Sequence, residues 1–107
     1  MAHNFIIGID LGGTNTKIGL LDKNLKLKNK VVFPTKKFAG RDNLINAISA
    51  GVIKLSKGYK ILGIGIGLPG PVDSKKGIVH YFPNIRGFKN VHLGKIIRLK
   101  TGIFSIL

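Results

Sequence analysis

Two short apolar runs near the N-terminus, separated by a glycine-rich turn, constrain the fold of this chain more than any other feature. The runs cover residues 5–11 and 18–21, and the turn between them contains Gly-Gly-Thr-Asn-Thr. Apolar runs of this length, bounded by Gly and Thr, predict the two strands of a β-hairpin. One carboxylate, Asp10, lies inside the first run, where a charge is costly to bury without a partner. A cation, or water held by a cation, would supply that partner.

The turn itself has the composition of an anion-binding loop. Gly12 and Gly13 leave the backbone free to approach a bulky anion, and successive N–H groups in such a turn form a concave site for negative charge. The spacing matches neither a Walker A loop nor G-x-G-x-x-G, and the turn would join two strands rather than open a helix. An ordinary tight hairpin is the alternative interpretation. The combination of Asp10 with this turn favours a metal–phosphate site.

The composition is that of a small globular domain. The chain has 107 residues, of which 44% are hydrophobic, enough for one domain with a modest core. Since it has no Cys, disulfides and thiolate metal sites are impossible, and a reducing cytoplasm is the simplest setting. No apolar run approaches the ~20 residues of a membrane span, and residues 1–4 lack the basic region of a signal peptide. We therefore expect a cytoplasmic protein that makes no membrane contact.

The net charge of +14 is extreme for this length. Such a charge would suit binding to nucleic acid or to an anionic membrane. However, the lysines are spread over the whole chain, in no block longer than the pairs Lys36–Lys37 and Lys75–Lys76, and no aromatic residues interleave with them. This distribution favours a solvated, lysine-rich surface, which makes nucleic acid an unlikely partner. The chain could also be part of a longer protein whose remainder is acidic.

The rest of the chain predicts an α/β fold with helices on the faces of a mixed sheet. The hydrophobic periodicity indicates the following elements after the hairpin: a strand with one wet face over 25–33, a helix over 41–57, a fully buried glycine-rich strand over 61–68, a short strand over 78–81, a helix over 91–100 and a strand over 103–107. The predicted order is β-β-β-α-β-α-β, with a hairpin-like insertion before the second helix.

A second motif supports the first. The segment Gly63-Ile-Gly-Ile-Gly-Leu-Pro-Gly-Pro-Val-Asp73 is followed by Gly77-Ile-Val and Pro83-Asn84. Alone, it predicts only a buried strand and a Pro/Gly turn. Together with the 10–17 run, it resembles the ROK family of bacterial glucokinases, fructokinases, N-acetylhexosamine kinases and related repressors, within the actin-like ATPase superfamily. The resemblance covers residues 5–107 and implies a ribonuclease H-like lobe.

The resemblance also implies roles for individual residues. Asp10 is similar to the acid that holds Mg²⁺, through water, beside the nucleotide phosphates. The residues that resemble the turn around the β- and γ-phosphates of ATP, and its edge, are Gly12, Gly13, Thr14, Asn15, Thr16 and Lys17. Gly70 and Asn84 match positions that line the sugar site. From the residues alone, Lys17 could equally be a solvent-facing strand lysine, Asn84 could cap its own loop, and Asp73 is expected to fix its turn.

The general base of the family has no counterpart in this sequence. In the family, the strand similar to Ile103–Leu107 runs straight into an Asn-Asp pair, whose Asp activates the sugar hydroxyl. That base is thus expected beyond Leu107, and no residue up to Leu107 is assigned a catalytic role. The resemblance implies that residues 1–107 are the N-terminal lobe of an ATP-dependent, glucokinase-like sugar kinase, truncated before that Asp and inactive alone. Its implied partners are a hexose, ATP with Mg²⁺, and either a second kinase lobe or another copy of the chain on an exposed face.

Two other interpretations stay open. A ROK transcriptional repressor would carry the same lobe as a sugar sensor, although such proteins place a winged helix-turn-helix before the phosphate motif, and only residues 1–4 precede it here. The other alternative is a basic nucleic-acid-binding module. Its affinity for DNA would fall steeply as the salt concentration rises. His3, His80 and His92 lack metal-ligand spacing, so we expect all three to be structural or surface residues.

Overall fold

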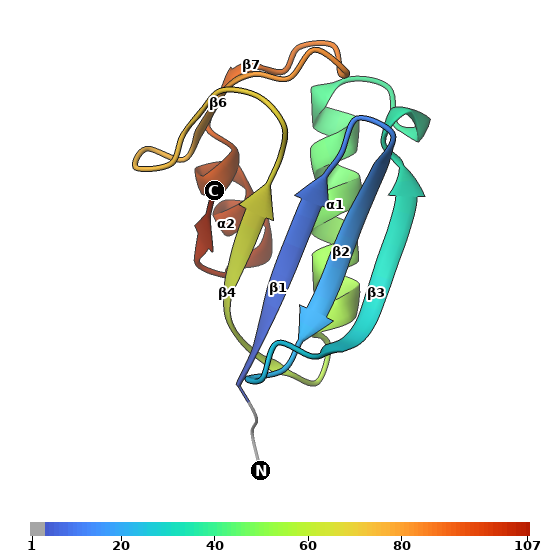
Figure 1. The fold of residues 1–107 in the computed structure, drawn as a ribbon, viewed down its shortest axis with the longest axis vertical. Coiled ribbons are helices and arrows are strands. Elements are labelled where there is room, and N and C mark those ends of the chain that lie inside the picture. The colour runs from blue at the N-terminus through green and yellow to red at the C-terminus, as the bar shows by residue number, and fades with distance from the viewer. Residues whose placement is uncertain (1–3) are drawn as a thin grey trace.

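A five-stranded mixed sheet organises the fold (Figure 1). The computed structural model describes residues 4–107. The sheet has the order β3-β2-β1-β4-β8, in which β1 runs antiparallel to β2 and parallel to β4. Its strands are β1 (Asn4–Leu11), β2 (Asn15–Leu21), β3 (Leu27–Pro34), β4 (Lys60–Gly67) and β8 (Ser105–Ile106). The α/β class and the mixed sheet predicted from the sequence are confirmed.

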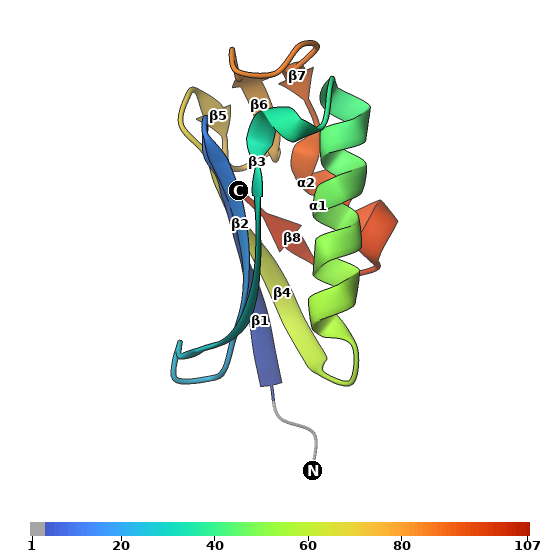
Figure 2. The same ribbon diagram turned by 90° about the vertical axis from the view of Figure 1, so that its right-hand side faces the viewer.

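Two helices cover one face of this sheet and leave the other face bare (Figure 2). They are α1 (Arg41–Ser56) and α2 (Leu93–Thr101). The helix α1 buries Leu44, Ile48 and Val52 against the sheet, as expected for an amphipathic helix with one apolar stripe. Gly51 also faces the sheet, because a Cβ there would lie only 2.6 Å from Cδ1 of Ile18. Gly51 therefore lets α1 approach β2 closely, and this packing offsets the poor helix propensity of glycine.

A small antiparallel sheet lies at one end of the large sheet. It consists of β5 (Val72–Asp73), β6 (Ile78–Tyr81) and β7 (Lys89–Val91), in the order β5-β6-β7. The prediction identified only the central strand of the three, because strands of two and three residues carry too little periodicity to be recognised. A 3₁₀ turn, η1 (Thr35–Lys37), was likewise not predicted. No helix within residues 4–107 is long and apolar enough to cross a membrane.

The prediction that 61–68 forms a fully buried strand is wrong for this chain. In β4, Ile64 and Ile66 are buried under the helices, whereas Gly65 is exposed on the opposite face. Leu62 is exposed as well, because the register with β1 shifts between Ile61 and Ile64 and interrupts the alternation there. The physical reason is that both helices lie on the same face of the sheet (Figure 2). A strand alternates its side chains between the two faces, so β4 is covered on one side only.

The last predicted strand, over 103–107, is shorter in the structure than expected. Only Ser105–Ile106 pairs with β4, so Ile103 and Leu107 lie outside β8. The reason is the way α2 ends. Its C-cap Gly102 has a φ of +75°, and the N–H of Ile103 donates to the Thr101 hydroxyl at 3.2 Å, so the first residues after the helix make a turn. Leu107 is half-buried and packs against the core without being part of a strand.

Candidate functional site

The predicted phosphate loop connects β1 to β2 at the edge where β1 ends (Figure 1). It is a tight turn, closed by the N–H of Gly12, which donates to the carbonyl oxygen of Asn15 at 3.0 Å. A Cβ on Gly12 would lie 2.6 Å from that oxygen, closer than side-chain carbons approach backbone atoms. The turn therefore requires glycine at this position. Thr14 and Asn15 are exposed on it.

Thr35, at the start of η1, holds the loop in place through three hydrogen bonds. Its N–H donates to the carbonyl of Thr14 at 2.9 Å, and its hydroxyl donates to the carbonyl of Gly12 at 2.6 Å. The hydroxyls of Thr16 and Thr35 are 2.9 Å apart. Because the Thr35 proton is already given to Gly12, the Thr16 hydroxyl must be the donor in this pair. Both threonines are fully buried.

Sequence reasoning missed Thr35 and placed Thr16 among the phosphate contacts. Since the Thr16 hydroxyl is buried and donates to Thr35, its side chain supports the loop from inside. The pairing of Asn15 with Pro34 and Thr16 with Phe33 sets residue 35 opposite the turn. That register, in a three-stranded meander, is the only signal that could have identified Thr35, and it is not fixed by the periodicity of either strand.

Asp10 lies beside the loop, and its environment corrects the expectation of a buried acid. It is exposed on the bare face of the sheet, because strand side chains alternate and its neighbours Ile9 and Leu11 point toward the helices. Lys17 is its cross-strand neighbour on β2 and is also exposed. The ion pairs found within residues 4–107 are Lys28–Asp22 and Arg41–Asp42, so neither Asp10 nor Lys17 is held by a partner there.

The residues near the loop could bind Mg²⁺ only together with water and substrate phosphates. Residues 4–107 contain no cluster of three or more carboxylate or imidazole side chains that could hold a metal alone. Mg²⁺ commonly keeps several waters and binds through one or two carboxylates together with substrate phosphates. A single exposed carboxylate next to the predicted phosphate loop is compatible with that mode, but it could not hold Mg²⁺ by itself.

The predicted sugar-site residue Asn84 lies directly against the phosphate loop. A Cβ on Gly13 would lie 2.9 Å from Nδ2 of Asn84, although the two residues are far apart in the sequence. The β6–β7 loop that carries Asn84 is anchored by the buried side chains of Phe82 and Ile85, and the N–H of Phe82 donates to the carbonyl of Phe88 at 3.0 Å. Within the described chain, the Asn84 side chain makes no hydrogen bond that would cap its own loop.

Gly70 shapes the turn that leads into the small sheet. Its φ of +118° lies in a region that L-residues rarely adopt, and a Cβ there would lie 2.8 Å from the carbonyl oxygen of Tyr81. The glycine thus lets this turn approach the strand that runs into the Asn84 loop. Asp73 fixes its own turn, as predicted, because its Oδ1 accepts the N–H of Lys76 at 3.0 Å.

The segment that ends at Leu107 leads toward the same edge of the sheet as the glycine turn. The strand β8 runs parallel to β4, which itself runs parallel to β1. Leu107 therefore follows β8 on the side where the turn follows β1. The side chain of Leu107 is apolar and packs against the core, so it contributes no chemical group to the site. The expectation of a general base beyond Leu107 stays a prediction.

His80 and His92 take no part in this arrangement. His80 and His92 are exposed and belong to no metal-binding cluster of the described residues, while His3 lies outside residues 4–107. The structure therefore brings together the glycine turn, Asp10 and Lys17 at its edge, and Asn84 against it.

Comparison with known proteins gives consistent matches over almost the whole chain. A profile described as the ROK family matches residues 6–105. A glucokinase of Thermotoga maritima is 35% identical over 97 residues, which cover 91% of this chain and 31% of that protein. A ROK family glucokinase from Streptomyces griseus, solved in complex with glucose and AMPPNP, aligns with a TM-score of 0.85 at 27% identity, over 96% of this chain and 32% of its own.

A third match is a ROK family transcriptional regulator, a homologue of the E. coli MLC protein. It aligns with a TM-score of 0.84 at 21% identity, over 97% of this chain and 27% of its own. At that identity the likeness shows the fold alone. This chain spans about a third of the length of the glucokinases that it matches.

Proposed function

This chain belongs to the ROK family, and we propose that it forms the N-terminal, phosphate- and sugar-binding lobe of an ATP-dependent sugar kinase of the glucokinase type. The observation that carries the proposal is the contact between Gly13 and Asn84. A kinase must bring the terminal phosphate of its donor to the accepting hydroxyl of the sugar. Phosphoryl transfer depends mainly on such positioning and on charge neutralisation, and here the two implied binding elements touch.

In this proposal the loop binds the β- and γ-phosphates of ATP. The exposed Thr14 and Asn15, together with the backbone N–H groups of Gly13 and Thr14, supply hydrogen-bond donors, whereas the N–H of Gly12 is used to close the turn. Lys17 adds positive charge at the edge, on the same face as Asp10. Thr16 acts through Thr35, by holding the loop in shape rather than by touching phosphate.

Asp10 is proposed to accept hydrogen bonds from water on Mg²⁺. A bound Mg²⁺ would neutralise phosphate charge during the transfer. Asn84 is proposed to bind a sugar hydroxyl through its side-chain amide, whose polar atoms are unused within residues 4–107, and Gly70 to line the pocket with its backbone.

The base that takes the hydroxyl proton is proposed to come from outside residues 1–107. The direction of β8, which leads through Leu107 toward the edge that carries the glycine turn, supports a base that follows Leu107 in a longer chain. Residues 1–107 alone should therefore bind ligands without turning them over.

The proposed function can be tested by titrating the ¹⁵N-labelled chain with AMPPNP, with and without Mg²⁺. We expect amide shifts at the glycine turn and at Asn84, and binding that is tighter with Mg²⁺. Asp10→Asn should abolish the Mg²⁺ dependence, whereas the matched control Asp42→Asn, which changes an exposed acid paired with Arg41, should keep it. Equal behaviour of the two variants, or shifts that avoid the turn, would contradict the proposal. Glucose-dependent ATP turnover by the chain alone would contradict its half-site part.

The bare face of the sheet is the proposed contact with the second lobe. It carries an apolar hollow of about 400 Å³, and Leu62, Phe104 and Ile106 on it are 55%, 61% and 51% exposed. Large exposed apolar patches mark interaction surfaces. A second copy of the chain would bring another charge of +14, which opposes association. The glucokinases that match are about three times as long, so we assign the face to the remaining part of such a protein.

A sugar-sensing lobe of a ROK repressor is the second candidate. A ROK transcriptional regulator shares the fold of this chain, and the glucokinases share the same fold, so ligand binding has to separate the two functions. The same AMPPNP titration separates the two functions, because a sensor lobe needs glucose binding but not Mg²⁺-dependent nucleotide binding. Glucose-induced shifts at Asn84, with no AMPPNP response at the glycine turn, would favour the repressor.

A further inference from the structure

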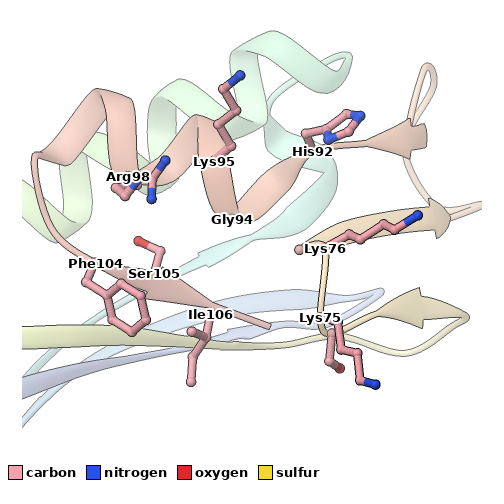
Figure 3. A pocket seen from close by; sticks show the side chains of 11 residues that line it. Lys75, Lys76, His92, Gly94, Lys95, Arg98, Phe104, Ser105 and Ile106 are labelled. Atoms are coloured by element: carbon pink, nitrogen blue, oxygen red, sulfur yellow. The ribbon is translucent and has the colours of Figure 1, made fainter.

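A basic hollow lies apart from the glycine turn, between the turn that joins β5 to β6, the start of α2, and β8 (Figure 3). Its volume is about 380 Å³, within the range of small-ligand sites. Four cationic side chains line it: Lys75 and Lys76 from the turn, and Lys95 and Arg98 from the helix. None of the residues that resemble the ATP or sugar sites of the family contributes to its lining.

A close approach of two glycines builds this hollow. Gly77 has a φ of +68°, and its carbonyl accepts the N–H of Gly94 on α2 at 3.2 Å. A Cβ on Gly77 would lie 3.6 Å from Cα of Gly94, so the two backbones are almost in contact. This contact sets the lysine-bearing turn against the helix that carries Lys95 and Arg98. Those two residues are three positions apart and share a helix face.

The positive charge of the hollow has no counterion among the described residues. No acid lines it, and the ion pairs within residues 4–107 involve Asp22 and Asp42, which lie elsewhere. The acid nearest in sequence, Asp73, is half-buried and accepts the N–H of Lys76. The first turn of α2 has no acid either, and His92 makes no side-chain cap there. The positive end of the helix dipole therefore adds to the four cations.

The layout of the charged groups indicates the kind of anion that would fit. In Figure 3 the side chains of Lys75, Lys76 and Lys95 point outward from the rim of the hollow in three different directions, so their ammonium groups do not meet at one point. One orthophosphate could contact only part of such a ring, whereas a chain of phosphoryl groups carries several negative charges along its length. We propose that this hollow binds a linear oligophosphate, either as a free inorganic chain or as the triphosphate tail of a nucleotide, at a site separate from the glycine turn.

Titration of the ¹⁵N-labelled chain with inorganic tripolyphosphate, in buffer without divalent metal, tests this site. We expect saturable amide shifts at residues 75–77 and in the first turn of α2, in addition to any shifts at the glycine turn, which is itself proposed to bind phosphate. The double variant Lys76→Gln/Arg98→Gln should weaken binding roughly tenfold or more, because it removes two of the four local charges. The matched control Lys23→Gln/Lys57→Gln removes the same charge from exposed positions outside the hollow, and it should bind almost as the unchanged chain does.

Two further titrations identify the source and the limits of the site. ATP that produces the same shifts with similar affinity would assign the hollow to the nucleotide tail, and a response to tripolyphosphate alone would assign it to a free inorganic chain. Equal losses in the two double variants would overturn the proposal, as would shifts confined to the glycine turn. Mixed-sequence duplex DNA provides a further test. The proposal would also be overturned if this DNA bound with the same affinity per phosphate as tripolyphosphate, and if Lys76→Gln/Arg98→Gln did not change that affinity. Loss of AMPPNP binding at the glycine turn would leave this site unaffected, so the two proposals fail separately.

Discussion

Replacing Thr35 with Val tests whether one buried hydroxyl holds the phosphate loop. Val keeps the shape of Thr, so no cavity forms, but the carbonyl of Gly12 loses its donor and the buried hydroxyl of Thr16 loses its acceptor. An unsatisfied buried hydroxyl costs about 1–3 kcal/mol, and the lost bond to the half-buried carbonyl about 0.5–1.5 kcal/mol. We therefore expect Thr35→Val to lower the free energy of unfolding by about 2–4 kcal/mol, a large part of the total for a domain of this size.

A second substitution should restore part of this loss. In the double variant Thr16→Val/Thr35→Val, both buried hydroxyls are gone, so only the carbonyl of Gly12 lacks its former donor. Replacing both partners of a buried hydrogen bond by apolar groups of the same shape costs little. The double variant should thus be more stable than Thr35→Val by about 1–2 kcal/mol. Thr35→Ser, which keeps the hydroxyl, is the matched control and should lose less than Thr35→Val.

Urea unfolding followed by far-UV circular dichroism at pH 7 measures these differences. The m-value should stay constant across the set, because the surface exposed on unfolding hardly changes. The dissociation constant of AMPPNP with Mg²⁺ should rise for Thr35→Val and not for Thr35→Ser. The reasoning is refuted if Thr35→Val is within about 0.5 kcal/mol of the unchanged chain, or if the double variant is the less stable of the two.

Three further predictions follow from the structure. Gly12→Ala should cost about 1–3 kcal/mol in urea unfolding and weaken AMPPNP binding, because the new Cβ would lie 2.6 Å from the Asn15 carbonyl; unchanged binding would exclude the glycine turn as the phosphate site. The hydrogen bond from the N–H of Lys26 is the chief cause that lowers the pKa of Asp22. Asp22→Asn should therefore be less stable than the unchanged chain at pH 7. The difference should shrink as the pH falls from the ordinary pKa of an Asp through the lowered pKa of the folded chain, and it should vanish below the latter; a difference that persists after the carboxylate is protonated would contradict this. Gly65→Val should leave stability unchanged, because a Cβ there meets nothing within 4 Å, but in the longer protein it should disrupt packing of the second lobe; intact packing, or loss of self-association in this chain instead, would contradict the assignment of the bare face.

Long, regular elements could be predicted from the sequence because their periodicity is a local property. The helix α1 begins at the predicted residue, Arg41, and β6 has the predicted bounds, Ile78–Tyr81. The strands β5 and β7 could not be predicted, since two or three residues show no repeat, and they form only because β6 lies between them. The glycine turn was recognised because Gly-Gly-Thr-Asn-Thr directly follows an apolar strand that contains an acid.

The tertiary contacts of the site could not be obtained in this way. Thr35 was missed because its role depends on the register between β2 and β3 and on a turn that ends β3. The contact of Asn84 with Gly13 joins two loops from opposite ends of the chain, and no short-range pattern reports such a pair. The family resemblance assigned both residues to one reaction, but the structure adds that they touch, on which the proposed function rests.

The two errors about burial have one common cause, which bears on the bare face of the sheet. Asp10 was expected to be enclosed and β4 to be covered on both sides, yet Asp10 and Gly65 lie on the face that no helix covers. In register, Gly65 and Gly19 flank Gly8 on the two neighbouring strands. The side chain of Leu21 reaches the space above Gly8, and that of Leu27 the space above Gly19, whereas the space above Gly65 is open. No atom of residues 4–107 lies within 4 Å of the place of a Cβ on Gly65, so the packing of these residues does not account for the glycine there.

A glycine in a strand weakens it unless another backbone must come close. The row of glycines, together with the exposed Leu62 and Ile106 beside it, thus has the composition of a covered surface. If a second lobe packs against this row, Asp10 at the edge of the same face would be enclosed only once the lobe has docked. Water around Asp10 would then be displaced at the step that completes the site, which strengthens its interaction with a cation. In this view, the position of Asp10 within an apolar run suits the assembled protein, in which the second lobe covers it, rather than this chain alone.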